Sequence, residues 1–509
     1  NEQFYLYLAL TKASEQVILT YSVMTSKGES KRPSYLINRV KQVFPKLVVE
    51  KEESDTSYEK IMGSDKGKSY LISHLADGTY AKDVIWWEIA SHYEKKTPGI
   101  LKDLLRIREK RAGNNSLKKE AAKRLFGDVL YGSVTRFEQY VQCPFAFFAH
   151  YGLLLNERQQ YEISSLDHGN LFHQAMEHLS HELEQRNKNW QDLSEEEAVS
   201  LAAECVDAVA ERYQGRKYFQ SNRVSFMLKR LKNEVVHSVW AMWHQMQEGD
   251  FVQTYTEKGF RGNDKEWESM CIPFGEDAKI CLNGVIDRVD LCSLPGEKLI
   301  KIIDYKSSDS QDLLLAKVYY GLQMQLLTYL EAAKEMVEKE HEGKEAVPAA
   351  MLYYVIKEKN LDWKPESEEE YEKRVLDSMK CKGYVNEEPE IIGHLDKSVV
   401  NGGELIPGQK SGVVPVAVDK KGLLKKNSGT LSTKDFETLI AHTKEKMKEC
   451  GKAILDGKIE AIPYVYEDND GCTYCPYGSV CGHESKKDGV REMKKMSDDE
   501  VWEALYGDN

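Results

Sequence analysis

The sequence contains no apolar run that approaches the length needed to cross a bilayer, and it contains few cysteines. Ten cysteines among 509 residues are too sparse for a scaffold of disulfides. We therefore expect a cytoplasmic protein in a reducing environment, in which most cysteines are small buried side chains.

The sequence also lacks an excess of basic residues. Its 70 lysines and arginines are outnumbered by 83 aspartates and glutamates, which gives a formal net charge of −13. This balance excludes a protein coated with basic charge, but it permits a local groove for nucleic acid because electrostatic steering depends on the local field. The length exceeds what one core can serve and predicts about two to four domains.

Four of the ten cysteines form a pattern that is typical of a metal site. Cys472, Cys475 and Cys481 follow one another with C-x2-C-x5-C spacing, and Cys143 lies far upstream, directly before a proline. Four thiolates gathered from two distant segments suit either an iron–sulfur cluster or a zinc ion. The spacing alone leaves both alternatives open.

Two alternating segments, 280–291 and 298–306, predict a pair of strands with Pro295-Gly296 between them. A hairpin centred on that dipeptide would place Asp287 opposite Asp304, with Cβ atoms roughly 5 Å apart. Both carboxylates would then face apolar neighbours, which is costly for a lone charge without a compensating cation. The pattern therefore predicts a cation site on this hairpin.

Magnesium suits such a site because it prefers hard oxygen ligands and keeps water and phosphate oxygens in its shell. Lys306, two residues after Asp304, could orient a water molecule or stabilise negative charge on a phosphate. The Asp-x-Lys pattern alone is common, and an exposed salt bridge at a strand end is its simpler interpretation.

An amphipathic helix predicted over 167–184 adds His173 and Glu177, which share one face at i and i+4. A packed core or surface histidine is the simpler interpretation of His173. A zinc site that adds His181, one turn later, is a further alternative without a second ligand cluster of zinc-like spacing.

Beyond the strands, Gln325 and Tyr329 share a helical face. Such a pair could position DNA or the lysine, although simple packing is more common. We expect three regions: residues 1–130 as a first domain with a helical linker, 131–485 as the main domain and 486–509 as a charged tail. Residues 386–429 suggest a poorly ordered insertion. Since the chain begins within an apparently structured segment, we expect a C-terminal fragment of a longer polypeptide.

Several of these motifs occur in one order along the chain. They are Ser133–Glu138, Cys143–Phe145, Gly169–His173, Gly284–Asp290, Ile303–Ser307, Gln325 with Tyr329, and the three C-terminal cysteines. The ordered set resembles the RecB-like PD-(D/E)xK nucleases of the iron–sulfur type, and within them the C-terminal part of AddB-type subunits of bacterial AddAB helicase–nucleases. The match covers 131–485. Residues 6–13 are similar to the last motif of superfamily 1 helicases, with Lys12 where an active helicase usually has arginine.

The resemblance implies an α/β PD-(D/E)xK core, in which a mixed sheet is flanked by helices and stapled by an iron–sulfur cluster, after a remnant of a helicase-like α/β domain. It also implies roles for individual residues. The catalytic metal would be held by His173, Asp287, Asp304 and the carbonyl of Tyr305; Lys306 would be the catalytic lysine, supported by Gln325 and Tyr329; and a 4Fe–4S cluster would be held by Cys143, Cys472, Cys475 and Cys481.

By the same resemblance, we expect a Mg²⁺-dependent DNA exonuclease that digests the 5′-terminated strand during double-strand-break repair by recombination. Its partners would be DNA, as single strands or unwinding duplex ends, and an AddA-type helicase–nuclease subunit in a heterodimer. One alternative is a catalytically silent, nuclease-like scaffold that binds DNA and the helicase partner. Another is a free-standing nuclease of the same superfamily, such as a CRISPR-associated one.

Overall fold

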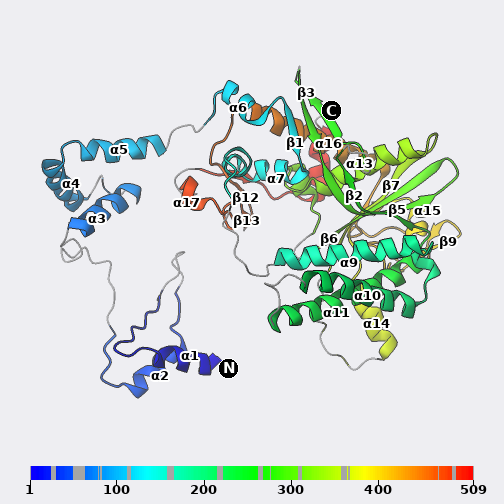
Figure 1. The fold of residues 1–509 in the computed structure, drawn as a ribbon, viewed down its shortest axis with the longest axis horizontal. Coiled ribbons are helices and arrows are strands. Elements are labelled where there is room, and N and C mark those ends of the chain that lie inside the picture. Colours follow the sequence, from blue (N-terminus) through cyan, green and yellow to red (C-terminus); the bar gives the residue numbers. More distant parts are fainter. Residues whose placement is uncertain are drawn as a thin grey trace. The chain divides into compact units, whose positions relative to one another are not determined.

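The structure is a computed structural model of the chain, and it divides into two compact units, residues 1–112 and 113–509, which are described separately (Figure 1). No helix in the described part is long and apolar enough to cross a membrane. The structure describes residues 2–23, 30–49, 64–77, 80, 83–111, 116–156, 165–214, 222–261, 267–275, 277–307, 312–356, 361, 364, 367–467, 469–483 and 489–507.

The described residues of the first unit form helices, and those between residues 64 and 111 enclose a small core. The buried core side chains are Leu71, Leu75, Trp86, Ala90 and Tyr93. The helicase-like α/β character inferred for this region stays a prediction. The helices are α1 (Glu2–Thr11), α2 (Tyr35–Val43), α3 (Ser64–Asp77), α4 (Val84–Lys96) and α5 (Ile100–Arg111).

The second unit is built on a six-stranded mixed sheet with the order β11-β8-β7-β6-β5-β2. The pairs β6–β7 and β8–β11 are parallel and the other pairs are antiparallel. Its strands are β2 (Val252–Phe260), β5 (Gly284–Ser293), β6 (Glu297–Lys306), β7 (Glu345–Val355), β8 (Lys382–Asn386) and β11 (Thr430–Leu431). Three smaller sheets contain β1 (Val129–Gly132), β3 (Met270–Phe274) and β4 (Ala278–Leu282); β9 (Val400–Asn401) and β10 (Glu404–Leu405); and β12 (Tyr464–Tyr466), β13 (Asn469–Asp470) and β14 (Arg491–Met493).

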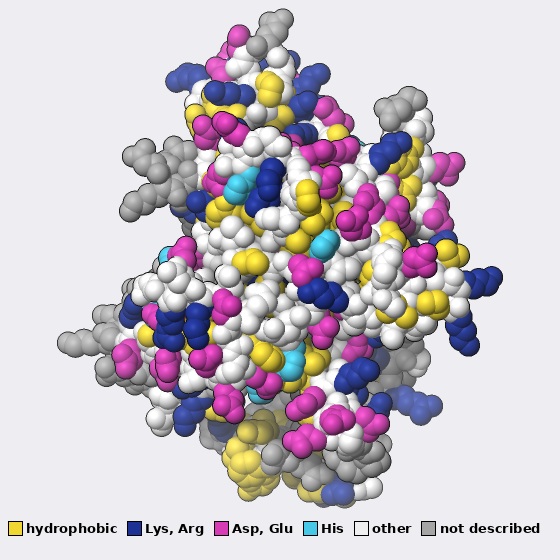
Figure 2. Space-filling model, turned by 90° about the vertical axis from the view of Figure 1, so that its right-hand side faces the viewer, with side chains coloured by type: hydrophobic (Ala, Val, Ile, Leu, Met, Phe, Trp, Pro, Cys, Tyr) yellow, Lys and Arg dark blue, Asp and Glu magenta, His cyan; other side chains and the backbone are white. Residues whose placement is uncertain are grey.

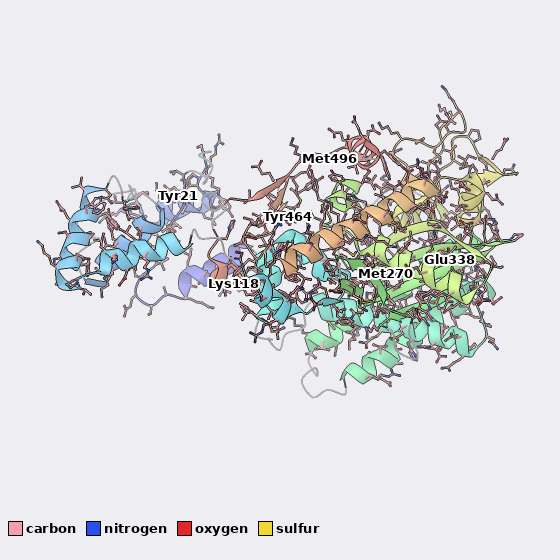
Figure 3. The ribbon with its side chains drawn as sticks, turned by 90° about the horizontal axis from the view of Figure 1, so that it is seen from above. Tyr21, Lys118, Met270, Glu338, Tyr464 and Met496 are labelled. Carbon is pink, nitrogen blue, oxygen red and sulfur yellow. A yellow bond between two sulfur atoms is a disulfide. The ribbon has the colours of Figure 1, made fainter. Side chains whose placement is uncertain are left out.

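Helices cover both faces of this sheet, as the alternation of buried side chains along β6 requires. Ile300 and Ile302 pack into a core with α7, α13 and α16, whereas Leu299 and Ile303 pack into a second core with α9, α10 and α11. Figure 1 shows the two helical layers, and Figure 3 shows α16 lying over the sheet. The first layer contains α7 (Val134–Gln142), α13 (Gln325–Glu340) and α16 (Thr433–Leu455); the second contains α9 (Ser165–Gln185), α10 (Glu195–Gln214) and α11 (Asn222–Gln247).

The predicted α/β core, a mixed sheet flanked by helices, is confirmed. Shorter elements complete this unit. Figure 2 shows acidic and basic side chains interspersed over one face, in agreement with a chain that is not coated with basic charge. The shorter helices are α6 (Lys119–Phe126), α8 (Pro144–Phe147), a π-helical turn (Phe148–Gly152), 3₁₀ turns (Trp190–Asp192 and Lys397–Val399), α12 (Leu315–Tyr319), α14 (Glu368–Ser378), α15 (Pro389–Leu395), α17 (Gly478–Cys481) and α19 (Asp498–Gly507).

The boundary between the units lies at residues 112 and 113, earlier than the predicted boundary after residue 130. The reason is that β1 pairs in parallel with β4, so the segment before residue 131 completes a sheet of the second unit. The predicted tail also belongs to this unit, because β14 pairs with β12 and Val501 of α19 is fully buried.

One further expectation is wrong. The segment 386–429 is a packed part of the second unit, because Ile392, Val399 and Val414 are buried beside the α9–α11 layer. The sequence hid this because the apolar residues are scattered among turn-forming residues. Cys271 and Cys281 form a disulfide, since the antiparallel register of β3 and β4 places them directly opposite each other.

Candidate active site

The β5–β6 hairpin has the register that the sequence predicts. Leu294 and Glu297 exchange backbone hydrogen bonds around a two-residue turn of Pro295-Gly296, in which the glycine adopts a φ of +87°. This left-handed conformation favours a residue without a Cβ atom. The pairing continues as far as Arg288 opposite Ile303, so the next position on each strand places Asp287 opposite Asp304.

Both aspartates are buried, with 8% of Asp287 and 3% of Asp304 exposed. The Tyr305 N–H donates to Oδ2 of Asp287 at 2.7 Å, and Nζ of Lys306 lies 2.5 Å from Oδ2 of Asp304. Burial, and then the neighbouring charge of Asp304, raises the pKa of Asp287. Burial also raises the pKa of Asp304, despite the opposing charge of Lys306. The pair is therefore short of positive charge, a condition that a bound cation relieves. The Tyr305 carbonyl as a ligand stays a prediction.

His173 and Glu257 complete this cluster. Nδ1 of His173 lies 2.8 Å from Oε1 of Glu257 and 3.6 Å from Oδ1 of Asp287. One ligand atom from each of these three residues lies within 4.8 Å of the others. Burial opposes protonation of His173, but the hydrogen bond to Glu257 and the charge of Asp287 raise the pKa of the imidazole. Two carboxylates and one imidazole at these distances can hold a divalent cation, and Asp304, opposite Asp287 in the hairpin, is not part of this three-residue group.

Glu257 was missed by the sequence reasoning. It lies on β2, which pairs with β5, and it has an unusual φ of +46°. The only available signal was a carboxylate in a strand that precedes the hairpin. Glu177, on the same helix as His173, is not part of the three-residue group. Nδ1 of His181 lies 3.5 Å from Oε2 of Glu184, and 61% of the His181 side chain is exposed. The zinc alternative built on His181 therefore gains no support.

Lys306 is connected to Gln325 and Tyr329 by hydrogen bonds. Its Nζ donates to Oε1 of Gln325 at 3.0 Å, and Nε2 of Gln325 donates to the hydroxyl of Tyr329 at 3.0 Å. Both partners lie on the first turns of α13, at the i and i+4 positions of one helical face. The structure thus brings the predicted lysine and its two predicted supporting residues together.

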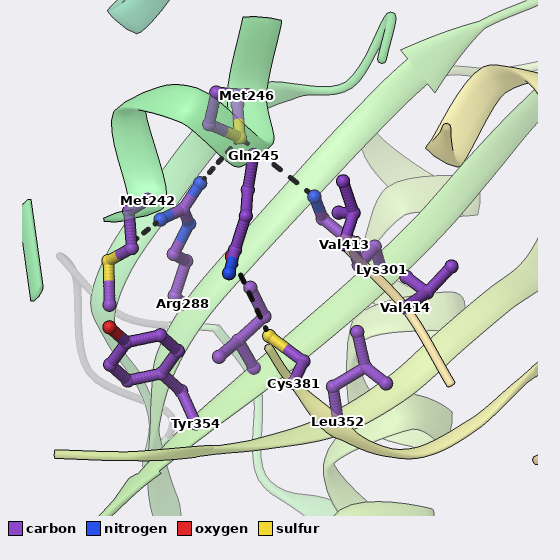
Figure 4. A pocket seen from close by; sticks show the side chains of 11 residues that line it. Met242, Gln245, Met246, Arg288, Lys301, Leu352, Tyr354, Cys381, Val413 and Val414 are labelled. Carbon is purple, nitrogen blue, oxygen red and sulfur yellow. Dashed lines mark hydrogen bonds between the residues drawn. The ribbon is translucent and has the colours of Figure 1, made fainter. Parts of the chain in front are cut away.

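A different arrangement of charges lies on the opposite face of the same strands. Asp290 is fully buried and receives Nε of Arg288 at 2.7 Å and Nζ of Lys301 at 2.8 Å. Burial would raise the pKa of Asp290, but these two cations hold it below its ordinary value. Figure 4 shows Arg288 and Lys301 reaching towards the sulfur atoms of Met242 and Met246 in a small pocket. Among the described residues, Arg288 and Lys301 supply the positive charge that matches this buried carboxylate.

The four predicted cysteines lie near one another, although they come from two segments that are far apart in the sequence. Cys143 follows the last turn of α7 and is buried together with Tyr477, which lies between Cys475 and Cys481 in the chain. Gly471 allows a close approach, because a Cβ atom there would lie 2.9 Å from the carbonyl oxygen of the residue before Cys143. All four cysteines are free thiols.

The electrostatics of this cysteine site suit a group that carries positive charge. Burial, and then the nearby Asp470 and the other three cysteines, raises the pKa of Cys472 to about 11. Of these four described cysteines, no three have sulfur atoms within 4.8 Å of one another. Four sulfurs around a single zinc ion would be separated by roughly 3.8 Å, given Zn–S bonds of about 2.3 Å. The iron–sulfur cluster and the zinc ion both stay predictions for this site.

Comparison with known proteins agrees with this fold and with a nuclease-like domain. A family model for the PD-(D/E)XK nuclease superfamily matches residues 132–482. The chain is 34% identical over 513 residues to the B subunit of the ATP-dependent helicase/deoxyribonuclease from Lachnoclostridium phytofermentans, in an alignment that covers 99% of this chain and 43% of that protein. It is 32% identical over 526 residues to the protein of the same name from Clostridium perfringens strain 13, covering 99% and 44%. The chain thus spans less than half the length of these relatives, and the resemblance found in the sequence is confirmed.

Proposed function

We propose, from the premise that the chain belongs to the PD-(D/E)XK nuclease superfamily, that its second unit is a Mg²⁺-dependent deoxyribonuclease. The observation that supports this most directly is the convergence of Asp287, Asp304 and Lys306 in a cluster that is short of positive charge. A structural salt bridge would instead leave each carboxylate matched by a cation.

In this proposal, His173, Glu257, Asp287 and Asp304 would hold the cation. When bound, the cation supplies a coordinated water of lowered pKa and neutralises charge on the phosphate. The Tyr305 N–H holds the carboxylate of Asp287 in place. Lys306, held by Gln325, presents an ammonium group that can donate to a phosphate oxygen as negative charge develops there.

The finer parts of the proposal follow from the relatives. Their names describe a B subunit of an ATP-dependent helicase/deoxyribonuclease, which supports an AddA-type subunit as the partner of this chain in a heterodimer. DNA, as single strands or unwinding duplex ends, would be the substrate. Exonucleolytic digestion of the 5′-terminated strand in recombinational repair is the activity that the family resemblance favours.

The cysteine site would hold a 4Fe–4S cluster with a structural role. Cys143 and the C-terminal cysteines come from opposite ends of the nuclease region, so the cluster would close a very long loop. By analogy with a disulfide, such closure stabilises the fold by roughly 5 kcal/mol. Anaerobic purification, visible absorbance and an iron and zinc assay test this assignment, because a zinc site would be colourless and would contain no iron.

The nuclease assignment is tested with end-labelled single-stranded DNA, with and without Mg²⁺. Asp304→Ala and Lys306→Ala should each lower cleavage by at least about 100-fold, because each removes a group in direct reach of the reaction. Lys298→Ala, a change of a half-buried lysine at the other end of the same strand, serves as the matched control. DNA binding without Mg²⁺-dependent cleavage by the unaltered protein would favour the silent scaffold instead.

A further inference from the structure

Helix α13 begins without a cap of its own. Its N-cap residue is Met324, whose side chain accepts no hydrogen bond from the first turn. The first backbone N–H groups of a helix need acceptors from elsewhere, and an oxygen-bearing N-cap side chain usually supplies one. The start of α13 therefore depends on another part of the chain.

Glu138 of α7 supplies that acceptor from far away in the sequence. Its Oε1 accepts from the N–H of Met324 at 2.6 Å and from the N–H of Gln325 at 3.2 Å, across separations of 186 and 187 residues. The carboxylate also lies at the positive end of the α13 dipole, where negative charge is favoured. Helix α7 is itself held firmly, because its apolar face is buried in the core. The buried side chains are Val134, Phe137, Tyr140 and Val141.

Gln325 connects Glu138 to Lys306, because its backbone contacts Glu138 and its side chain contacts Lys306. Gln325 donates its backbone N–H to Oε1 of Glu138 and accepts from Nζ of Lys306 at its own Oε1. Charge also connects the sites, because the pKa of Glu138, raised to about 7 mainly by burial, is affected by Lys306 and Asp304. A small displacement of the first turn of α13 would move the amide of Gln325 away from the lysine.

We propose that Glu138 is a positioning residue of the active site, which fixes the first turn of α13 so that Gln325 meets Lys306. This inference rests on the proposed nuclease function for its effect on catalysis. Its structural part, the capping of α13 by Glu138, is independent of that function. Glu138 contacts neither the scissile phosphate nor the cation in this account, and it acts through Gln325.

Kinetics of Glu138→Ala and Glu138→Gln on single-stranded DNA test the catalytic part. The alanine variant should lower kcat by at least about tenfold with KM for DNA within about twofold, because substrate-binding groups are untouched. The glutamine variant should recover most of kcat, since its amide oxygen can accept the same two N–H groups. Glu184→Ala, which removes an exposed carboxylate on α9, should leave both constants unchanged.

A double-mutant cycle shows whether the effect passes through Gln325. If it does, Glu138→Ala in a Gln325→Ala background should cause less than about a twofold further loss, because the linked residues act as a unit. The inference would be overturned if the activity loss of the double variant equalled the product of the two single losses, or if Glu138→Ala were as active as the unaltered protein. Either result would leave the nuclease assignment intact.

Amide hydrogen exchange tests the structural part without any cleavage. The segment 322–330 should exchange faster in Glu138→Ala than in the unaltered protein, and Glu138→Gln should restore slow exchange. The segment 433–455 of α16 serves as the internal reference for global unfolding. Unchanged exchange at the start of α13 in Glu138→Ala would refute the capping role, even in a protein that cuts no DNA.

Discussion

Asp287 and Asp290 lie three positions apart on β5, and they illustrate two different uses of a buried carboxylate. Because side chains alternate along a strand, Asp287 and Asp290 point to opposite faces of the sheet. Asp290 is matched by Arg288 and Lys301, and its pKa is lowered. Among the described residues, Asp287 is matched only by the backbone N–H of Tyr305 and by a histidine that it shares with Glu257, and its pKa is raised.

The difference shows how a functional acid can be distinguished from a structural one. The charge of a buried carboxylate is balanced when enough cationic side chains surround it. A buried carboxylate beside another carboxylate is instead stabilised when a cation binds from solution. Both acids stand in one motif of seven residues, Gly284–Asp290, so spacing alone does not separate them. The partners contributed by neighbouring strands and helices make the distinction.

The largest expected effect is on activity at the first of these acids. Asp287→Asn should lower Mg²⁺-dependent cleavage by about 1,000-fold, since it removes a charged ligand that a neutral amide replaces poorly. Its free energy of unfolding without metal should not decrease, because the amide oxygen can still accept from the Tyr305 N–H. Chemical denaturation beside a cleavage assay checks both, and a large loss of stability would contradict the comparison.

The reverse result is expected at the second acid. Asp290→Ala leaves Arg288 and Lys301 buried without a matching charge and should lower the free energy of unfolding by about 3–5 kcal/mol. Urea denaturation measures this loss. Asp207→Ala, which removes an exposed partner of Lys232, should change stability by less than about 0.5 kcal/mol. If Asp290→Ala changed the free energy of unfolding by as little, the ion pairs of Asp290 with Arg288 and Lys301 would not be structural.

A smaller effect is expected at Glu257, which the structure adds to the site. Glu257→Gln should weaken Mg²⁺ binding by about 10–100-fold, because it removes a charge that both faces the cation site and orients His173. Calorimetric titration of Mg²⁺ into the protein measures the affinity. Glu268→Gln, an exposed change near the start of β3, is the control. Equal affinities in the two variants would remove Glu257 from the site.

The pH dependence should also differ between the two faces. The raised pKa of Asp287 means that its contribution to folding stability is present at low pH and is lost as pH rises through its folded pKa. A cation must displace that proton, so Mg²⁺ affinity should rise with pH, by up to about tenfold per unit for one proton. Asp290, with its lowered pKa, instead loses its stabilising effect on acidification. Mg²⁺ titrations at several pH values test this, and Asp287→Asn should flatten the rise.

Local patterns were sufficient for the parts of the site that lie close together in the chain. The alternation along the two strands and the turn residues between them predicted the hairpin, and with it the pairing of Asp287 and Asp304. Helical periodicity likewise placed Gln325 and Tyr329 on one face. The family resemblance, rather than periodicity, assigned His173 to the same site.

Other parts could not be derived in this way. Glu257 is separated from His173 by two long helices, and their association depends on how those helices pack. The segment 386–429 has a composition that is typical of a loop, yet its few apolar residues find a surface to pack against. Composition also gave no sign that Cys271 and Cys281 would be paired, which depends on the register of two strands.

By itself, the sequence determined the hairpin of β5 and β6 and which chemical groups stand a fixed number of residues apart, because backbone periodicity is a local property. Only the tertiary structure decided which of those groups are left without a matching charge. It also decided that Glu138 caps a helix nearly two hundred residues away. The physical reason is that compensation of a buried charge depends on every element packed around it, and no short stretch of sequence contains that information.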